Sequence, residues 1–163
     1  MVAIDIDLND TVKKNVNQKC MDVAQNLIKS STEPCELIIA HCWSLANEKY
    51  LREIASNITS NQVDEMANRE RSFHAEWFEA FCKKYEDLDL SEAYFIKGDP
   101  EEEIPALVVD DKIDVLVMGT VNTTQTAGLF ISSRAETILD ATTTCSVLTV
   151  KPDGFVSPIS ATS

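Results

Sequence analysis

Residues that could hold an anion follow the apolar segment Val115–Met118. Gly119 comes first, a long polar loop follows, and Ser133 stands at the next convincing helix start. Strand-to-helix connections usually take roughly 2–6 residues, so a loop of this length is a candidate binding site. The free N–H groups and positive dipole end of a helix that begins at Ser133 favour an anion. The same serine begins Ser133-Arg134-Ala135-Glu136, a capping-box pattern that would use the hydroxyl to satisfy a helix N–H.

Apolar patterns predict strands that alternate with helices along the chain. The continuous apolar run in ELIIAHCW is typical of a strand that is covered on both faces of a sheet. Regular alternation of strand and helix predicts an α/β fold with a parallel sheet and right-handed connections. The expected strands are Val2–Ile6, Glu36–Trp43, Ala93–Ile96, Val115–Met118 and Ser146–Val150.

Helix starts have recognisable capping residues. Asn9 or Asp10 can cap the first helix, Thr59 with Gln62 forms a capping box, and Asp99 can cap a later helix. Leu45–Asn57 is expected to contain a short helix. The helix after Thr59 is expected to carry the apolar residues Val63, Met66, Ala67, Phe73, Trp77, Phe81 and Tyr85.

In an open parallel sheet, ligands bind at the carboxyl ends of the strands, where the strand order reverses. This rule selects polar and small residues from three expected strands. They are Asp5 and Asp7 after the first strand, His41 and Cys42 late in the second, and Gly119 after the fourth.

Composition narrows the classes of partner. The chain has 163 residues, a formal net charge of −13 and a pI near 4.4. An acidic surface repels phosphate backbones and anionic lipids, so neither nucleic acid nor a membrane is an expected partner. The five cysteines are scattered without metal-ligand spacing, as free thiols are in a reducing cytoplasm. We therefore expect a cytoplasmic protein without a metal site.

Several sequence blocks resemble one family in their order and over essentially the whole chain. They are KGDPEEEIP (97–105), MGTV (118–121), AETILD (135–140), CSVL (145–148) and VKPD (150–153). These blocks resemble the universal stress proteins, and among them the C-terminal domain of E-type tandem-domain members. The resemblance implies a single Rossmann-like open parallel sheet of five strands, order 3-2-1-4-5, with helices on both faces. It implies a non-catalytic domain with a role in the stress response.

The resemblance also implies a ligand, ATP or AMP, through the family loop pattern G-x-x-G-x9-G-[ST]. Gly119 matches its first glycine and Ser133 its final hydroxyl, whereas Asn122 replaces the second glycine and Ser132 the third. Asparagine tolerates positive φ, but Ser132 adds a side chain where the backbone would approach phosphate. Residues 119–133 contain no Lys or Arg. These departures predict a degenerate loop with weakened phosphate binding; a functional ATP- or AMP-binding domain is the alternative.

Two further residues belong to the pocket that the resemblance implies. Asp5 matches the family acid that faces the nucleobase or ribose, and Cys42 falls near the position whose backbone contacts adenine. From the residues alone, Asp5 and Asp7 share one face of a strand, so one of them could instead cap the next helix.

Two other classes of protein fit the sequence less well. A phosphoacceptor receiver domain would use Asp5, Asp7, Thr120 and Lys151, but its phosphorylated aspartate must end the third strand, and Asp99 instead precedes a helix. A hydrolase would need a nucleophile elbow such as GxSxG, which the chain lacks. Of the two histidines, His41 is expected to be a hydrogen-bonded core residue, and His74 a packed or surface residue.

Domain organisation and partners complete the sequence-based expectations. Residues 1–153 are expected to form the domain, residues 154–163 a flexible tail, and the chain to derive from a longer two-domain protein. An uncovered edge strand invites pairing. We therefore expect Ser146–Val150 to form a homodimer, or to pair with a sister domain in a tandem protein.

Overall fold

The computed structural model describes residues 1–6, 10–55, 57–88, 90–120 and 133–153. Its sheet has five strands in the order β3-β2-β1-β4-β5, and every neighbouring pair is parallel. This confirms the predicted α/β fold and strand order. The strands are β1 (Val2–Ile4), β2 (Leu37–Trp43), β3 (Leu90–Lys97), β4 (Val115–Gly119) and β5 (Ser146–Val150). The helices are α1 (Thr11–Ser30), α2 (Glu48–Glu53), α3 (Ser60–Lys83), α4 (Pro100–Asp110) and α5 (Ser133–Ala141).

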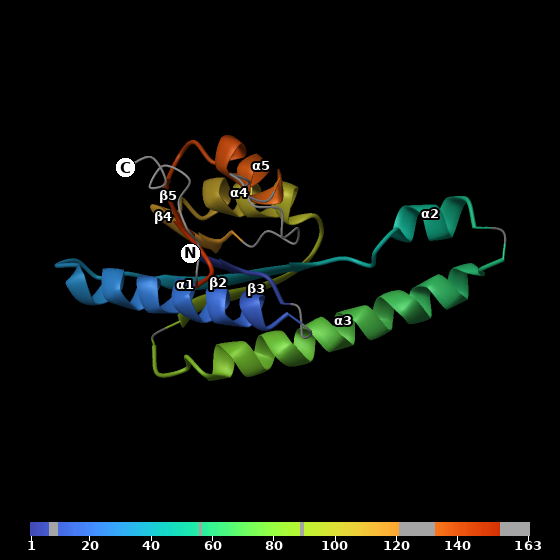
Figure 1. Cartoon of the computed structure of the whole chain (residues 1–163), viewed down its shortest axis with the longest axis horizontal. Coiled ribbons are helices and arrows are strands. Elements are labelled where there is room, and N and C mark those ends of the chain that lie inside the picture. Colours follow the sequence, from blue (N-terminus) through green and yellow to red (C-terminus); the bar gives the residue numbers. More distant parts are fainter. Residues whose placement is uncertain (7–9, 56, 89, 121–132, 154–163) are drawn as a thin grey trace, which may run out of the picture.

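Helices cover both faces of the sheet, as predicted. Helices α1 and α3 lie on one face, and α4 and α5 lie on the other (Figure 1). Alternate residues of the central strands feed two separate cores. Ile39 and Val117 join the core under α1 and α3, whereas Ala40 and Leu116 join the core under α4 and α5. All four side chains are at most 2% exposed, so the continuous apolar runs reflect burial on both faces.

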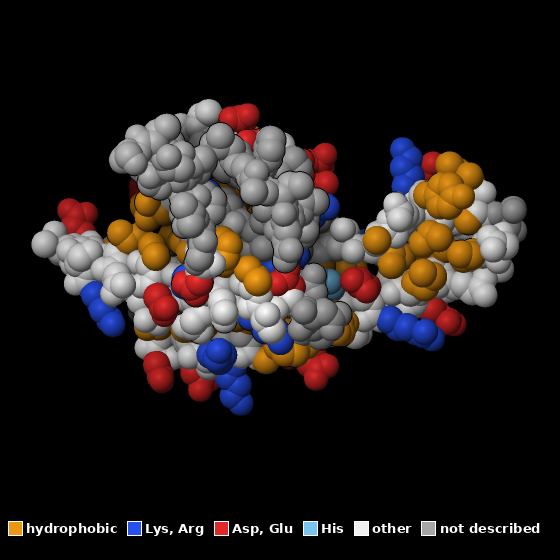
Figure 2. Space-filling view, viewed as in Figure 1, with side chains coloured by type: hydrophobic (Ala, Val, Ile, Leu, Met, Phe, Trp, Pro, Cys, Tyr) orange, Lys and Arg blue, Asp and Glu red, His pale blue; other side chains and the backbone are white. Residues whose placement is uncertain are grey.

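Helix α3 extends past the sheet and forms an arm with α2 (Figure 1). The apolar residues of this helix are only partly buried: Met66, Phe73 and Trp77 are 39%, 40% and 38% exposed. Hydrophobic side chains gather over α2 and the adjoining end of α3 (Figure 2), where Tyr50 and Ile54 are exposed.

The predicted caps of α1, α3 and α4 are confirmed. Asp10 accepts hydrogen bonds from two backbone N–H groups at the start of α1, and Asp99 accepts one from Glu101. Thr59 and Gln62 exchange the two bonds of a capping box.

Several predicted boundaries differ from the structure. β1 ends at Ile4 rather than Ile6, and the short second helix spans Glu48–Glu53. The third strand is twice the predicted length, Leu90–Lys97, and pairs with β2 from Leu37 to Trp43. Ser91 and Glu92 in its first half are polar and exposed because β3 is an edge strand, so no apolar pattern reveals that half.

Candidate functional site

A crevice of about 530 Å³ opens at the carboxyl ends of β1, β2 and β4. This is the switch point at which ligands bind in open α/β sheets. Asp5, Cys42 and Gly119 all line it, so the structure brings these three predicted site residues together. Helices complete the walls through Lys13, Val16 and Asn17 of α1, His74 of α3, Pro100 and Ile104 of α4, and Arg134, Ala135 and Ile138 of α5.

The other predicted site residues belong to the long loop and to the helix after it. Asn122 and Ser132 lie outside the described residues, as does Asp7. Ser133 is the first residue of α5, as expected from the sequence, and its side chain lies outside the described part. Its capping role therefore stays a prediction.

Asn17 holds the crevice end of β1 in place. Its side-chain amide donates to the carbonyl of Asp5 at 2.8 Å, and its side-chain oxygen accepts from the Asp5 N–H at 3.3 Å. The side chain thus replaces the strand partners that β1 loses beyond Ile4. Asn17 is only 7% exposed, and the sequence analysis did not identify it as a site residue.

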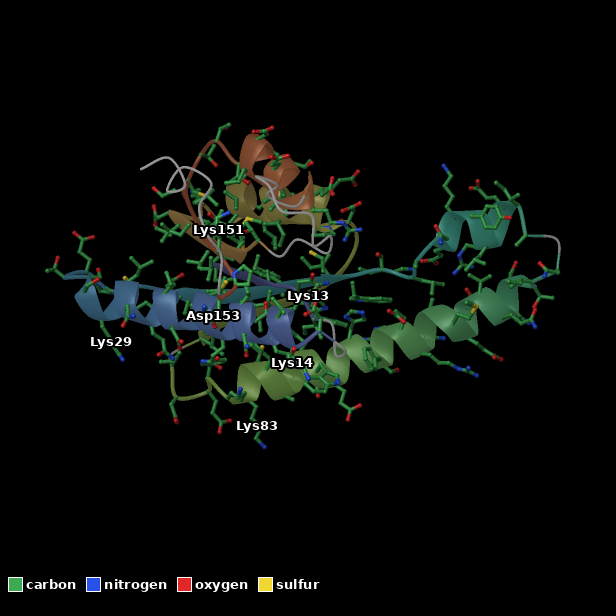
Figure 3. The ribbon with its side chains drawn as sticks, in the orientation of Figure 1. Lys13, Lys14, Lys29, Lys83, Lys151 and Asp153 are labelled. Atoms are coloured by element: carbon green, nitrogen blue, oxygen red, sulfur yellow. The ribbon has the colours of Figure 1, made fainter. Side chains whose placement is uncertain are left out.

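Both cationic side chains in the described wall have carboxylate partners. Lys13 Nζ lies 2.7 Å from Asp5 Oδ2, and Arg134 Nε lies 3.8 Å from Glu101 Oε1. Lys13 extends from the start of α1 toward the sheet (Figure 3), and its side chain is only 16% exposed. A ligand anion would have to share these cations with the carboxylates of Asp5 and Glu101.

Cys42 contributes an unreactive thiol to the crevice. Burial, followed by the nearby carboxylates of Glu103 and Asp99, raises the pKa of the Cys42 thiol to about 12. A thiol is nucleophilic as the thiolate, so this side chain is neutral and inert at physiological pH. Its part in the site is to shape the wall.

Gly119 is required by close packing and not by a turn. Its φ lies outside the left-handed region, and a Cβ built on it would come within 2.3 Å of Val16 Cγ1. Val16 belongs to α1 and is 1% exposed, so it has little room to move. The structure shows that this glycine lets α1 approach the end of β4.

We expect Gly119→Ala to lower the free energy of unfolding by about 1–3 kcal/mol, because overpacking a tight core displaces its neighbours. Chemical denaturation measures the change. Gly98→Ala is the matched control: its Cβ would come within 2.3 Å of Glu103, but of a carboxylate oxygen at the end of a flexible side chain. If both variants lost the same stability, the packing of Val16 against Gly119 would not be the cause.

The two histidines meet beside the crevice. His41, 1% exposed, hydrogen-bonds the carbonyl of Ile4, which confirms the prediction of a hydrogen-bonded core residue. His74 lines the crevice and contacts His41. The sequence analysis did not predict that contact.

The described residues contain neither a metal-binding cluster nor a membrane-spanning helix. These residues contain no cluster of three or more His, Cys, Asp or Glu side chains able to hold a metal ion. None of the described helices is both long and apolar enough to cross a membrane.

Comparisons with known proteins agree on one family. A model of the universal stress protein family matches residues 17–151. Universal stress protein E of Photorhabdus laumondii is 23% identical over 161 residues, 99% of this chain and 49% of that protein. The chain therefore spans about half the length of that relative.

Solved structures show the same fold. The hypothetical protein MJ0577 superimposes with a TM-score of 0.71 at 17% identity, covering 94% of this chain and 96% of the other. A universal stress protein family member from Arabidopsis thaliana, solved with AMP bound, gives a TM-score of 0.58 at 15% identity. That comparison covers 94% of this chain and 92% of the Arabidopsis chain.

Proposed function

Because the chain belongs to the universal stress protein family, we propose that it is a non-catalytic domain of the stress response that binds its ligand in the crevice. We further propose that the crevice accepts a monophosphate such as AMP at least as well as ATP. The loop after Gly119 lacks two glycines of the family pattern and contains no Lys or Arg, so it lacks groups that would favour the additional phosphates of ATP.

The ion pairs of the crevice carry this proposal. Lys13 and Arg134 are the cations of the described wall, and each already faces a carboxylate. A polyphosphate would add several negative charges beside Asp5 and Glu101, in a chain whose net charge is already −13. Each added phosphate therefore meets repulsion that the described wall does not offset.

The crevice and one structural neighbour support an adenine mononucleotide. A volume of about 530 Å³ lies within the usual size range of small-molecule pockets. The Arabidopsis neighbour holds AMP. Asp5, whose side chain is 67% exposed, offers carboxylate oxygens that can accept hydrogen bonds from ribose hydroxyls or an amino group.

Isothermal titration of the nucleotide-free domain with AMP and with ATP tests the proposal. We expect AMP to bind at least as tightly as ATP, and ATP to bind with a Kd above roughly 100 μM. A parallel assay should detect no ATP hydrolysis above the buffer rate. A micromolar Kd for ATP, at least tenfold below that of AMP, would overturn the proposal, and so would nucleotide turnover.

We also propose that β5 mediates assembly, either between two copies of this domain or with a sister domain in a longer protein. β5 is an edge strand, and Leu148 is 39% exposed. The Ser146 N–H and the Val150 carbonyl bond toward β4. The N–H groups of Val147 and Thr149 therefore point away from β4, where a second strand could pair with them.

Thr149→Pro should weaken the dimer by roughly tenfold or more, because proline removes an outward N–H from the edge without removing a bond to β4. Sedimentation velocity across a concentration series measures the change. Thr149→Ala, which keeps the N–H, is the control and should remain dimeric. An unaltered dimer in Thr149→Pro would exclude this edge, and a monomeric parent domain would exclude self-pairing altogether.

A further inference from the structure

His41 of β2 and His74 of α3 form a hydrogen-bonded pair at the side of the crevice. Nε2 of His41 lies 2.8 Å from Nδ1 of His74, and the ring planes are within 22° of each other. At this distance a proton must lie between the two nitrogens, with one ring donating and the other accepting. The side chain of His74 is 13% exposed, and that of His41 is almost fully buried.

The outer nitrogens of the pair both face acceptors. His41 Nδ1 lies 3.1 Å from the carbonyl oxygen of Ile4, and His74 Nε2 lies 3.3 Å from Oε1 of Glu70. A carbonyl and a carboxylate can only accept, so hydrogen bonds to both of them require hydrogen on both outer nitrogens. Counting the shared proton, the pair holds three N–H hydrogens, whereas two neutral imidazoles hold two. Making all three hydrogen bonds at once therefore requires one proton beyond the neutral pair.

The surroundings decide which ring carries the positive charge. His41 is enclosed by β1, β2 and the rings of Phe78 and Phe95, and burial lowers the pKa of His41 to about 4. His74 instead reaches the crevice and faces Glu70, whose side chain is 41% exposed. A charged ring costs least where solvent and an opposite charge are both at hand, which assigns the charge to His74.

Some charged groups on the neighbouring elements favour a proton on the histidine pair, and others oppose it. Asp5, after β1, favours a proton on the pair, and its charge acts on His41 in that sense. Lys13 of α1 opposes it but lies 2.7 Å from Asp5, and Arg134 across the crevice lies 3.8 Å from Glu101. Glu70, on the same helix as His74, provides the carboxylate that His74 contacts.

We propose that His41 and His74 form a proton-binding site in the wall of the crevice, with His74 held as an imidazolium that donates to both His41 and Glu70. This inference goes beyond the proposed function. It gives the crevice a third positive charge, beside those of Lys13 and Arg134. An anion in the crevice would then be held more tightly when the pair holds its extra proton.

The chain contains only two histidines, so long-range ¹H–¹⁵N spectra of the ligand-free, ¹⁵N-labelled domain resolve the pair directly. At pH 7 we expect three protonated ring nitrogens: Nδ1 of His41 and both nitrogens of His74. Glu70→Ala should remove the proton from Nε2 of His74, leaving two neutral rings. Glu65→Ala is the matched control on the same helix, since Glu65 is 71% exposed and lies 4.0 Å from Arg69.

Two neutral rings in the parent domain at pH 7 would overturn the proposal, as would a Glu70→Ala spectrum identical to that of the parent. Loss of the extra proton in Glu65→Ala as well would show that general helix charge, and not the Glu70 contact, holds it. The measurement uses no nucleotide, so its failure would leave the proposed ligand untouched. Conversely, failure to bind AMP would not change the expected spectra.

Discussion

Acidification from pH 7 to pH 4 is expected to cost the parent domain about 3 kcal/mol more stability than it costs a His41→Asn variant. Burial lowers the pKa of His41 to about 4, and the bond to the Ile4 carbonyl only partly offsets that effect. In the unfolded chain the ring titrates near its ordinary value of about 6.5. Between these two values the His41 ring binds a proton in the unfolded chain but stays neutral in the folded domain.

The sign of the effect follows from that difference. The folded pKa is the lower one, so the stabilisation from a neutral His41 is complete above about pH 6.5 and is lost as the pH falls toward 4. Asparagine does not titrate, and it can still donate to the Ile4 carbonyl. The variant therefore lacks this pH dependence, although its stability at pH 7 will also be lower.

Urea denaturation at half-unit steps from pH 4 to pH 7 measures both curves. Phe78→Leu is the matched control, because Phe78 packs beside His41 with ring centroids 6.0 Å apart but does not titrate. Its curve should run parallel to that of the parent at lower stability, whereas the His41→Asn curve should be flatter. Parallel curves for His41→Asn and the parent would show that His41 is protonated equally in both states.

The fold was predictable because its central strands are buried on both faces. The continuous apolar run in ELIIAHCW is typical of a central strand. Asp10, Thr59 and Asp99 cap their helices through local contacts that sequence spacing reveals. The first half of β3 was missed because its edge position leaves Ser91 and Glu92 exposed. Which part of α3 stays exposed could not be predicted, because local periodicity does not show how far a sheet extends.

The site was predictable only where strands form it. The rule that parallel strands present their carboxyl ends together brought Asp5, Cys42 and Gly119 into one list, and the structure places all three in the crevice. Asn17 and His74 reach the same crevice from helices. In the sequence each is an ordinary polar helix residue, and only packing of α1 and α3 on the sheet reveals its partner.

Restoring the family glycines in the long loop is expected to tighten ATP binding by roughly 100-fold, about 3 kcal/mol. This prediction rests on the proposal that Asn122 and Ser132 weaken the phosphate cradle. Both positions lie outside the described residues, and only the family loop pattern selects them. A hydrogen bond from a backbone N–H to a charged group contributes about 1.5–3 kcal/mol. Glycine lets the backbone approach a phosphate without a side chain between them.

If the two glycines add contacts to the additional phosphates of ATP, the Asn122→Gly/Ser132→Gly double variant should gain affinity for ATP more than for AMP. Titration calorimetry with both nucleotides measures this selectivity. Thr124→Gly/Ala127→Gly is the matched control, since it adds the same two glycines to the loop at positions outside the family pattern. An equal gain in the control would mean that loop flexibility alone limits binding. If neither variant gained affinity for ATP, the paired cations would be the cause of weak ATP binding. These pairs, Lys13 with Asp5 and Arg134 with Glu101, are unchanged in both variants.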